Sequence, residues 1–282
     1  MAASGLVGQA SAASGGALTI GEITVETLSD GHFDLPRAAF FDAEGMEPEA
    51  LPDPVRAGAH VWLLRLPGRT ILVDAGSGET LRAAYPATGA LTRDPLPFDA
   101  ASVTDIVATH MHADHIGGLM DSDSPRFPNA RLHLMQREWD YWTDPDRPAK
   151  VAERQRPLAG LIAGLAAALA YPRELHDGEA DLGGGVTLLP APGHTPGHAV
   201  VRLSGGGAEA FLLGDVFLNA AQLATPDLRY ALDADPDQAV ATRGAMFERL
   251  AGEGALFLAT HMTTPDFVRL ERRGAGFAVV GS

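Results

Sequence analysis

Four side chains of metal-binding type lie close together in the segment HMHADH at residues 110–115. The segment follows a short apolar run that we predict to be a buried strand. Side chains two positions apart beyond a strand can point the same way, so His110 and His112 can reach one metal ion. Asp114 and His115 lie one step further, where the chain turns and both can face a second ion. The pattern predicts a binuclear metal centre, which is typical of hydrolases.

Three further residues of ligand type, His194, Asp215 and His261, each follow a predicted apolar strand. Any one of them alone is weak evidence, because an isolated histidine is more often structural. Together with residues 110–115 they make seven ligands, enough for two ions that share one carboxylate. The sequence has no cysteine. The ligands are therefore imidazole and carboxylate, which suit zinc, manganese, iron or cobalt and exclude thiolate zinc fingers and iron–sulfur clusters.

The composition is that of a folded, acidic protein. The chain has 282 residues, of which 46% are hydrophobic, and a formal net charge of −15. A surface of that sign repels phosphate backbones and anionic lipid headgroups, so we expect neither nucleic acid nor a membrane surface as a partner. No apolar run approaches the ~20 residues that a membrane-spanning helix needs.

The beginning of the chain differs from the rest. It is rich in Ala, Ser and Gly and lacks the basic and apolar regions of a signal peptide. We predict a flexible tail over residues 1–19. A single domain is predicted over residues 20–282, because no low-complexity linker interrupts it. We expect a cytoplasmic protein, or a periplasmic one if an export signal has been removed.

Strands and helices alternate along this domain. Strands repeatedly lead into a loop with a ligand-type residue, so two sheets with helices outside fit better than one parallel sheet. Asp235-Pro236 is typical of a helix start, with an acidic N-cap and a proline at the first position. The predicted strands span 20–28, 60–66, 70–73, 105–109, 131–135, 186–190, 199–203, 210–213, 256–259 and 276–280, and the main predicted helices span 136–142, 158–169 and 235–250.

The ordered set of ligand motifs resembles the metallo-β-lactamase superfamily. The motifs are Thr109 to Gly118, Gly193-His194 to His198, Gly214-Asp215, and His261. The resemblance covers roughly residues 20 to 280. It implies an α/β (α+β) fold of the four-layer αββα sandwich type, in a single domain, with the metals at one edge between the sheets.

A second resemblance concerns one branch of that superfamily. The segments are similar to the branch that includes methyl parathion hydrolase and related lactone or aryl-ester hydrolases. They are Leu28-Ser29-Asp30-Gly31, Phe127-Pro128-Asn129-Ala130, Trp142 and residues 233–277. Members of this branch with different substrate preferences share these segments, so they do not select the substrate.

The superfamily resemblance also implies a role for each ligand. One metal would be held by His110, His112 and His194, the other by Asp114, His115 and His261, and Asp215 would bridge them. Asp74 matches the acid that supports the histidine loop, and His198 is expected just behind the ligands. We expect two divalent ions, zinc first, with manganese, cobalt or iron as alternatives.

The mechanism that follows is hydrolysis by a hydroxide shared between two metals, which opens a lactone or cleaves an aryl or alkyl carboxylic ester. Asp114 and Asp215 are the expected catalytic acids, with Asp114 as the proton shuttle. Trp142, Phe217 and Leu218 lie beside the metal motifs in sequence and are the predicted pocket residues, suited to a small uncharged substrate. We interpret residues 158–169 as packing or a dimer interface and expect a homodimer.

Several alternatives stay open. The same centre could hydrolyse organophosphate triesters in the manner of methyl parathion hydrolase, alone or beside lactones. Redox use of the fold and a catalytically inactive binding module are weaker readings, and a nuclease or a β-lactamase is disfavoured by charge and by branch. The remaining histidines, His32, His60, His133 and His176, belong to no motif and are interpreted as structural.

Overall fold

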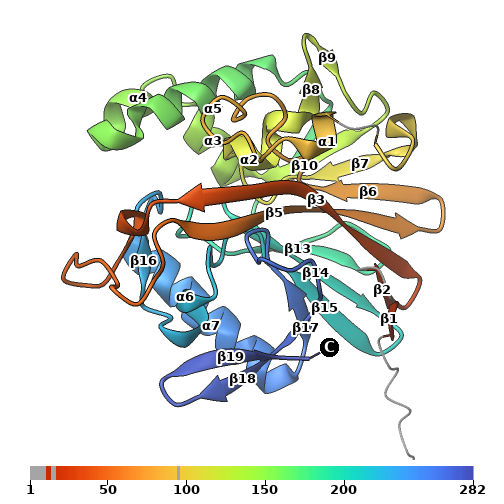
Figure 1. The fold of residues 1–282 in the computed structure, drawn as a ribbon. Helices are drawn as coiled ribbons and strands as arrows, with labels where there is room; N and C mark the ends of the chain where they lie inside the picture. The colour runs from red at the N-terminus through yellow and green to blue at the C-terminus, as the bar shows by residue number, and fades with distance from the viewer. Residues whose placement is uncertain (1–10, 14–16, 94–95, 282) are drawn as a thin grey trace, which may run out of the picture.

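The computed structural model describes residues 11–13, 17–93 and 96–281. Two β-sheets lie face to face, with helices α1 to α5 on the outer side of the larger sheet and α7 on the outer side of the smaller one (Figure 1). This is the predicted four-layer αββα sandwich, and the prediction is confirmed. Among the described residues, no helix is long and apolar enough to cross a membrane.

The larger sheet has eight strands. Its order is β1-β2-β3-β5-β6-β7-β10-β11. Pairing is antiparallel from β1 to β6 and parallel from β6 through β7 and β10 to β11. The bounds are β1 Ser11–Ala13, β2 Ala17–Ile20, β3 Ile23–Leu35, β5 Val55–Leu66, β6 Arg69–Val73, β7 Asp105–Val107, β10 Arg131–Met135 and β11 Arg173–His176.

The smaller sheet has five strands in the order β12-β13-β14-β15-β17. They are antiparallel except for the last pair, β15 and β17, which is parallel. The bounds are β12 Ala180–Asp181, β13 Val186–Pro190, β14 Ala199–Gly205, β15 Ala208–Leu212 and β17 Leu256–Leu258. Within the described ranges, three two-stranded ribbons complete the strands: β4 Phe40–Phe41 with β16 Arg229–Tyr230, β8 Met120–Asp121 with β9 Ser124–Pro125, and β18 Arg269–Arg273 with β19 Gly276–Val280.

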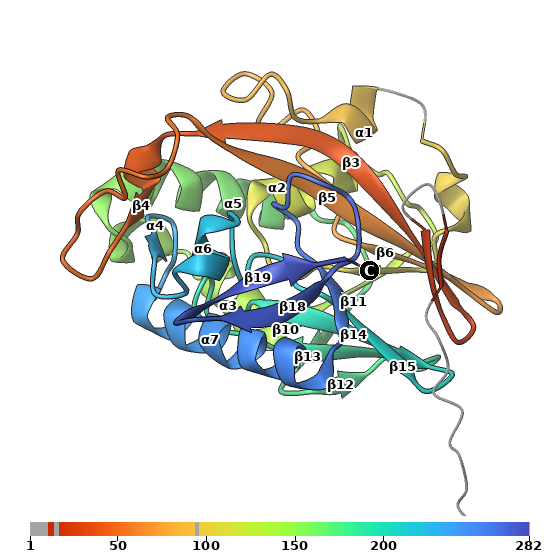
Figure 2. The same ribbon diagram turned by 60° about the horizontal axis from the view of Figure 1, so that its bottom comes forward.

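Helices cover the outer faces of both sheets. The helices are α1 Ala90–Arg93, α2 Ala113–Ile116, α3 Gln136–Thr143, α4 Arg147–Lys150, α5 Arg156–Ala168, α6 Ala221–Ala224 and α7 Pro236–Glu253, with short 3-10 turns at Arg37–Ala39, Ala100–Ser102, Gly117–Leu119 and Glu153–Gln155. Figure 2 shows α7 running along the smaller sheet, with the β18–β19 hairpin beside it. As predicted, α7 starts at an Asp235 cap, whose side chain accepts a hydrogen bond from the Gln238 N–H, 3.0 Å away.

Alternation of side chains explains why β5 is apolar along most of its length. Trp62 and Leu64 point into the core between the two sheets. Val61 and Leu63 point the other way, into the core beneath the helices, where α5 contributes Ile162. Because both faces of the strand are buried, its sequence lacks the alternation of polar and apolar residues that a half-exposed strand has.

The N-terminal boundary differs from the prediction. Residues 1–10 and 14–16 of the predicted tail lie outside the described residues, whereas Ala17 already belongs to β2 and therefore to the sheet. Strand β3 also runs on to Leu35, well past the predicted end at residue 28. A register shift between Ser29 and Gly31 interrupts its pairing with β5. Such a bulge breaks the period-two pattern from which strands are recognised.

Candidate metal centre

The segment 110–115 leaves the end of β7 and turns at once into α2. Backbone hydrogen bonds join this loop to both sheets: Asp74 N–H donates to Val107 O (2.9 Å), and Ala199 N–H donates to Thr109 O (2.9 Å). The end of β7 in the larger sheet and the start of β14 in the smaller sheet thus meet here. Residues just beyond the ends of strands project from the edge of a sheet. Ligand-type residues that are distant in sequence therefore come together at this edge of the sandwich.

The first group of ligand-type residues contains His110, His112, His194 and Asp215, all buried. The donor atoms of the four side chains lie within 4.8 Å of one another. His194 Nε2 is 3.0 Å from His112 Nδ1 and 3.2 Å from Asp215 Oδ2. The structure therefore brings together one predicted metal triad and the predicted bridging carboxylate.

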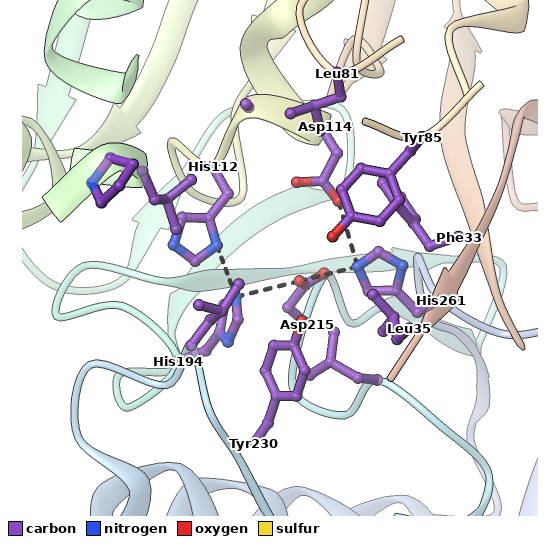
Figure 3. A pocket seen from close by; sticks show the side chains of 15 residues that line it. Phe33, Leu35, Leu81, Tyr85, His112, Asp114, His194, Asp215, Tyr230 and His261 are labelled. Atoms are coloured by element: carbon purple, nitrogen blue, oxygen red, sulfur yellow. Dashed lines mark hydrogen bonds and ion pairs between the residues drawn. The ribbon is translucent and has the colours of Figure 1, made fainter. Parts of the chain in front are cut away.

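The second group contains Asp114, His115 and His261. The Nε2 atoms of both histidines lie 3.5 Å from Asp114 Oδ2. Asp215 reaches this group too, with Oδ1 3.3 Å from His115 Nε2 and Oδ2 3.1 Å from His261 Nε2. Figure 3 shows Asp215 between His194 on one side and His261 on the other. Asp215 is thus the carboxylate placed between both groups, as a bridging ligand must be.

The donor atoms fit metal ions on a simple physical test. His110 Nε2, His115 Nε2 and Asp215 Oδ1 are buried and form no hydrogen bond among the described residues. A buried polar atom without a partner costs about 1–3 kcal/mol, so three of them in one small volume need an explanation. Divalent ions held by imidazole nitrogen and carboxylate oxygen would satisfy all three.

Asp74 orients part of the loop, as the sequence predicts for a supporting acid. Its Oδ1 accepts a hydrogen bond from the Thr109 N–H (2.8 Å), and its Oδ2 accepts from Thr109 Oγ1 (2.9 Å). His115 Nδ1 lies 2.8 Å from the same Oδ2. A carboxylate at Nδ1 fixes the N–H there, which leaves the Nε2 lone pair of His115 directed at the site.

Other ligands have partners of the same kind. His194 Nδ1 is 2.8 Å from Asp233 Oδ1, and His261 Nδ1 is 2.7 Å from the carbonyl oxygen of Gly58. The sequence did not identify Asp233 as a supporting acid, although the segment 233–277 that resembles one branch of the superfamily begins with it. A carboxylate 39 residues after the histidine it orients gives no local signal.

His198 lies behind the two groups of ligand-type side chains. Its Nδ1 is 3.1 Å from the carbonyl oxygen of Ala191, and its Nε2 accepts a hydrogen bond from the Asp215 N–H (2.9 Å). The ring therefore donates at Nδ1 and accepts at Nε2. His198 holds the backbone that carries Asp215 and does not itself belong to either ligand group.

Glu138 is the most important residue that the sequence did not reveal. This fully buried carboxylate on α3 accepts four hydrogen bonds: Oε1 from Met111 N–H (2.9 Å) and Trp142 Nε1 (2.7 Å), Oε2 from Thr195 Oγ1 (2.6 Å) and Gly197 N–H (3.0 Å). It ties the 110–115 loop to the 194–198 loop. At Gly197 an added Cβ would collide with the backbone of Glu138, so glycine is required for this approach.

Charge in the site is shared between imidazoles and carboxylates. Burial alone would lower the pKa of His194, but hydrogen bonds with Asp215 and Asp233 outweigh it and raise that pKa to about 9. Burial would likewise raise the pKa of Asp215, but the imidazoles of His261, His115 and His110 hold it well below its usual range. A divalent cation that binds here would compete with a proton on a group such as His194, so metal binding would release protons.

A cavity of about 280 Å³ opens onto the ligands. Its floor contains His112, Asp114, His194, Asp215 and His261, and in Figure 3 the side chains of Tyr85 and Tyr230 point into it. The walls are otherwise apolar, and no Lys or Arg is among the described residues that line it. The apolar lining residues are Phe33, Leu35, Leu81, Ala113, Pro157, Leu158, Leu218 and Leu232.

Of the three predicted pocket residues, only Leu218 lines this cavity. The prediction is wrong for Phe217, which is buried in the core beneath α7, with its ring 5.5 Å from that of Phe247. Trp142 does not line the cavity either: its indole donates to Glu138, and its ring packs edge-on to His112 at 5.6 Å. The side chains of successive residues point in different directions. Closeness in sequence to a metal motif therefore did not identify which residues line the cavity.

Known proteins resemble this chain in sequence and in fold. A probable metallo-hydrolase of Mycobacterium bovis is 28% identical over 197 residues, which cover 58% of each chain, so the match spans about three fifths of that relative. The dizinc quorum-quenching lactonase AidC, solved with a product of lactone opening, superposes with a TM-score of 0.82 at 23% identity, covering 94% of this chain and 96% of that one. The hydrolase AbOPH superposes with a TM-score of 0.81 at 22% identity and the same coverage.

The family assignment rests on the sequence match together with these folds. The model of the metallo-beta-lactamase superfamily matches residues 55–248, which is well over half of the chain and includes six of the seven predicted ligands. The seventh, His261, joins them in space. The protein belongs to the metallo-beta-lactamase superfamily.

Proposed function

We propose that the protein is a binuclear metal-dependent hydrolase that opens lactones or cleaves aryl or alkyl carboxylic esters. One observation carries the proposal: two groups of ligand-type side chains share Asp215 at the floor of an apolar cavity. His110, His112 and His194 would hold one divalent ion and Asp114, His115 and His261 a second, with Asp215 shared between them, and the bound ions would supply Lewis acidity that lowers the pKa of water and polarises an ester carbonyl. Zinc is the ion we propose first, since imidazole and carboxylate are common zinc ligands.

The residues around the centre have separate tasks in this reaction. Asp74, Asp233 and Glu138 hold the ligand loops in place. The acyl C–O bond breaks, the oxygen of water joins the acyl carbon, and a proton of that water must reach the departing oxygen. We assign this transfer to Asp114, whose carboxylate borders the cavity. In Figure 3 the Tyr85 and Tyr230 side chains lie beside Asp114 and Asp215, where their hydroxyls can donate hydrogen bonds to substrate oxygens.

The cavity supports an uncharged substrate with an apolar chain. Phe33, Leu35 and Leu218 offer hydrocarbon contacts. No lysine or arginine is among the described residues that line the cavity, so beyond the metal centre its walls offer no cationic side chain to a charged part of a substrate. An acyl lactone fits this combination of one polar floor and apolar walls. The structural similarity to AidC, a lactonase, agrees with this substrate class.

A phosphotriesterase activity is the second candidate, alone or beside lactone opening. The observation in its favour is the same uncharged lining, because a triester also lacks a net charge.

For the assembly we propose a homodimer, in which the outer face of α5 makes the contact. Light scattering would then give twice the chain mass of 29.5 kDa.

The test is a substrate panel on enzyme loaded with zinc, manganese or cobalt. Dihydrocoumarin, an acyl-homoserine lactone and a methyl aryl phosphotriester represent the candidates. We expect the highest kcat/KM on a lactone, and loss of all activities in the His110→Ala/Asp215→Ala variant while it stays folded. A triester preferred by orders of magnitude would select the second candidate. Unchanged turnover in the double variant would remove the metal centre from the mechanism.

A further inference from the structure

A third group of metal-binding side chains lies on the larger sheet, apart from the cavity. His133 is on β10, and Glu174 and His176 are on the edge strand β11. His133 pairs with Glu174 in the parallel register, and His176 lies two residues further on the same face. One donor atom from each of the three lies within 4.8 Å of the others. None of them lines the cavity or belongs to the binuclear groups.

His133 is oriented as metal-binding histidines usually are. Its Nε2 lies 3.0 Å from Asp105 Oδ1. Asp105 is itself held by Arg69, with Nε 3.1 Å from Oδ2 and Nη2 3.1 Å from Oδ1, and by a 2.6 Å hydrogen bond from Thr104 Oγ1. A carboxylate at Nε2 places the ring proton there. The Nδ1 of His133 therefore presents a lone pair, and it faces His176.

The distance between the two imidazoles suits a shared ion. His133 Nδ1 and His176 Nε2 are 3.2 Å apart, and the rings are nearly parallel, at 11°. Two nitrogens bound to one zinc at about 2.0–2.1 Å, in tetrahedral geometry, would be separated by about 3.3–3.4 Å. A single proton can occupy the same gap as a hydrogen bond. A divalent ion can replace that proton if each ring turns so that both lone pairs meet at one point beside the line between the two nitrogens.

Burial divides the group into a fixed part and an open part. His133 is buried, His176 is half-buried and Glu174 is exposed. The buried ring supplies a preset ligand, while the exposed carboxylate can swing onto an ion from the solvent side. Water can complete the coordination there, since the edge strand leaves one side of the group accessible.

We propose that His133, His176 and Glu174 form an accessory site for one divalent transition-metal ion, with two nitrogen donors and one oxygen donor from the protein. Imidazole donors favour zinc, nickel or copper over magnesium or calcium. The site binds more weakly than the binuclear centre, because it offers fewer protein ligands and faces water. The proposal is independent of the hydrolase function and stands or falls separately.

The experiment counts metal at equilibrium. The untagged full-length protein, stripped by a chelator, is dialysed against buffered zinc at increasing free concentration, and bound metal per chain is measured by mass spectrometry. We expect His176→Ala and Glu174→Ala to bind one ion fewer than wild type at the highest zinc concentration. His32→Ala, which removes a half-exposed histidine outside all three groups, is the matched control and should bind as wild type does.

Two further readouts separate this site from the binuclear centre. In the His110→Ala/Asp215→Ala background, the remaining histidines of the binuclear groups can still bind Cu²⁺, so the electron paramagnetic resonance spectrum is compared with and without His176→Ala. We expect a signal with coupling to two nitrogens that is present in that background and lost when His176→Ala is added. Hydrolysis by His176→Ala alone should equal that of wild type. Equal zinc content in wild type and His176→Ala, or a copper signal unaffected by that change, would overturn the proposal, even if the enzyme proves to be a lactonase.

Discussion

At the scale of single residues, the candidate ligands and the supporting residues Asp74 and His198 were predictable from the sequence, whereas the supports Asp233 and Glu138 were not. His110, His112, Asp114 and His115 stand in one segment, so residue type and spacing were enough to identify them. Their supports are scattered: Asp233 holds His194, and Glu138 holds two loops from a helix. A buried glutamate in a helix has the same sequence pattern as an exposed one. Only the fold shows that its four hydrogen bonds converge on the ligand loops.

Glu138 gives the prediction at this scale. In Glu138→Gln, one carboxylate oxygen becomes an NH₂ group that must face a donor, either at Met111 and Trp142 or at Thr195 and Gly197. We expect the two ligand loops to separate slightly and kcat/KM to fall about 10- to 100-fold, the usual range for residues that position metal ligands.

Activity and zinc retention after dialysis test this, with Asp140→Asn as the control. Asp140 is on the same helix, but its carboxylate is exposed and accepts from Gln136. If the Glu138→Gln variant kept the zinc retention and activity of the wild type, Glu138 would have no role in positioning the ligand loops.

At the scale of elements, regular strands were predicted well and irregular ones poorly. The strand at 131–135 has the predicted bounds, because its apolar run has clear ends. Strand β3 was predicted too short, because its bulge and its polar residues hide the second half. That second half has a function: it carries Asp30, Phe33 and Leu35 to the cavity side of the molecule.

Asp30 gives the prediction at the scale of elements. Its buried carboxylate accepts hydrogen bonds from the N–H groups of Ser77 (2.7 Å), Gly89 (3.2 Å) and Leu91 (3.1 Å). These bonds fix the segment that brings Leu81 and Tyr85 to the cavity. In Asp30→Asn an amide NH₂ would face one of these donors, so we expect a loss of about 1–3 kcal/mol in the free energy of unfolding and a KM raised more than kcat is lowered.

Denaturant unfolding and steady-state kinetics on a lactone check both parts. Asp34→Asn is the control, since Asp34 lies on the same strand but is exposed and paired with Arg56. A KM equal to that of wild type would contradict the role given to Asp30.

At the scale of the whole molecule, the sandwich and the family followed from the order of the motifs, but the cavity did not. Its walls come from β3, the 77–89 loop, the start of α5 and the 218–232 region. Such a surface exists only after both sheets have packed. Its composition could not be read from residues next to the motifs, and Phe217, which follows Asp215 by two residues, points into the core instead.

A substitution at Leu158 tests whether the cavity holds the acyl chain of a lactone. It lies at the start of α5 and lines the wall. In Leu158→Trp the larger ring would fill space that an acyl chain needs, so kcat/KM on a long-chain acyl lactone should fall about 10-fold relative to a short one, which corresponds to about 1.4 kcal/mol of binding energy.

Leu161→Trp, on the same helix but outside the lining, should leave that ratio unchanged. If both variants changed the ratio equally, the cavity would not be the acyl-chain site.

The central claim is that two ions, joined by Asp215, are needed for hydrolysis. The most direct measurement is zinc titration of stripped enzyme in the His176→Ala background, which removes the proposed accessory site from the count. Lactone turnover should rise with added zinc and reach its plateau at two equivalents per chain. Lactone turnover should be absent without metal. The Asp215→Ala variant should stay inactive at every zinc concentration. Full turnover at one equivalent, or in the metal-free protein, would contradict the account.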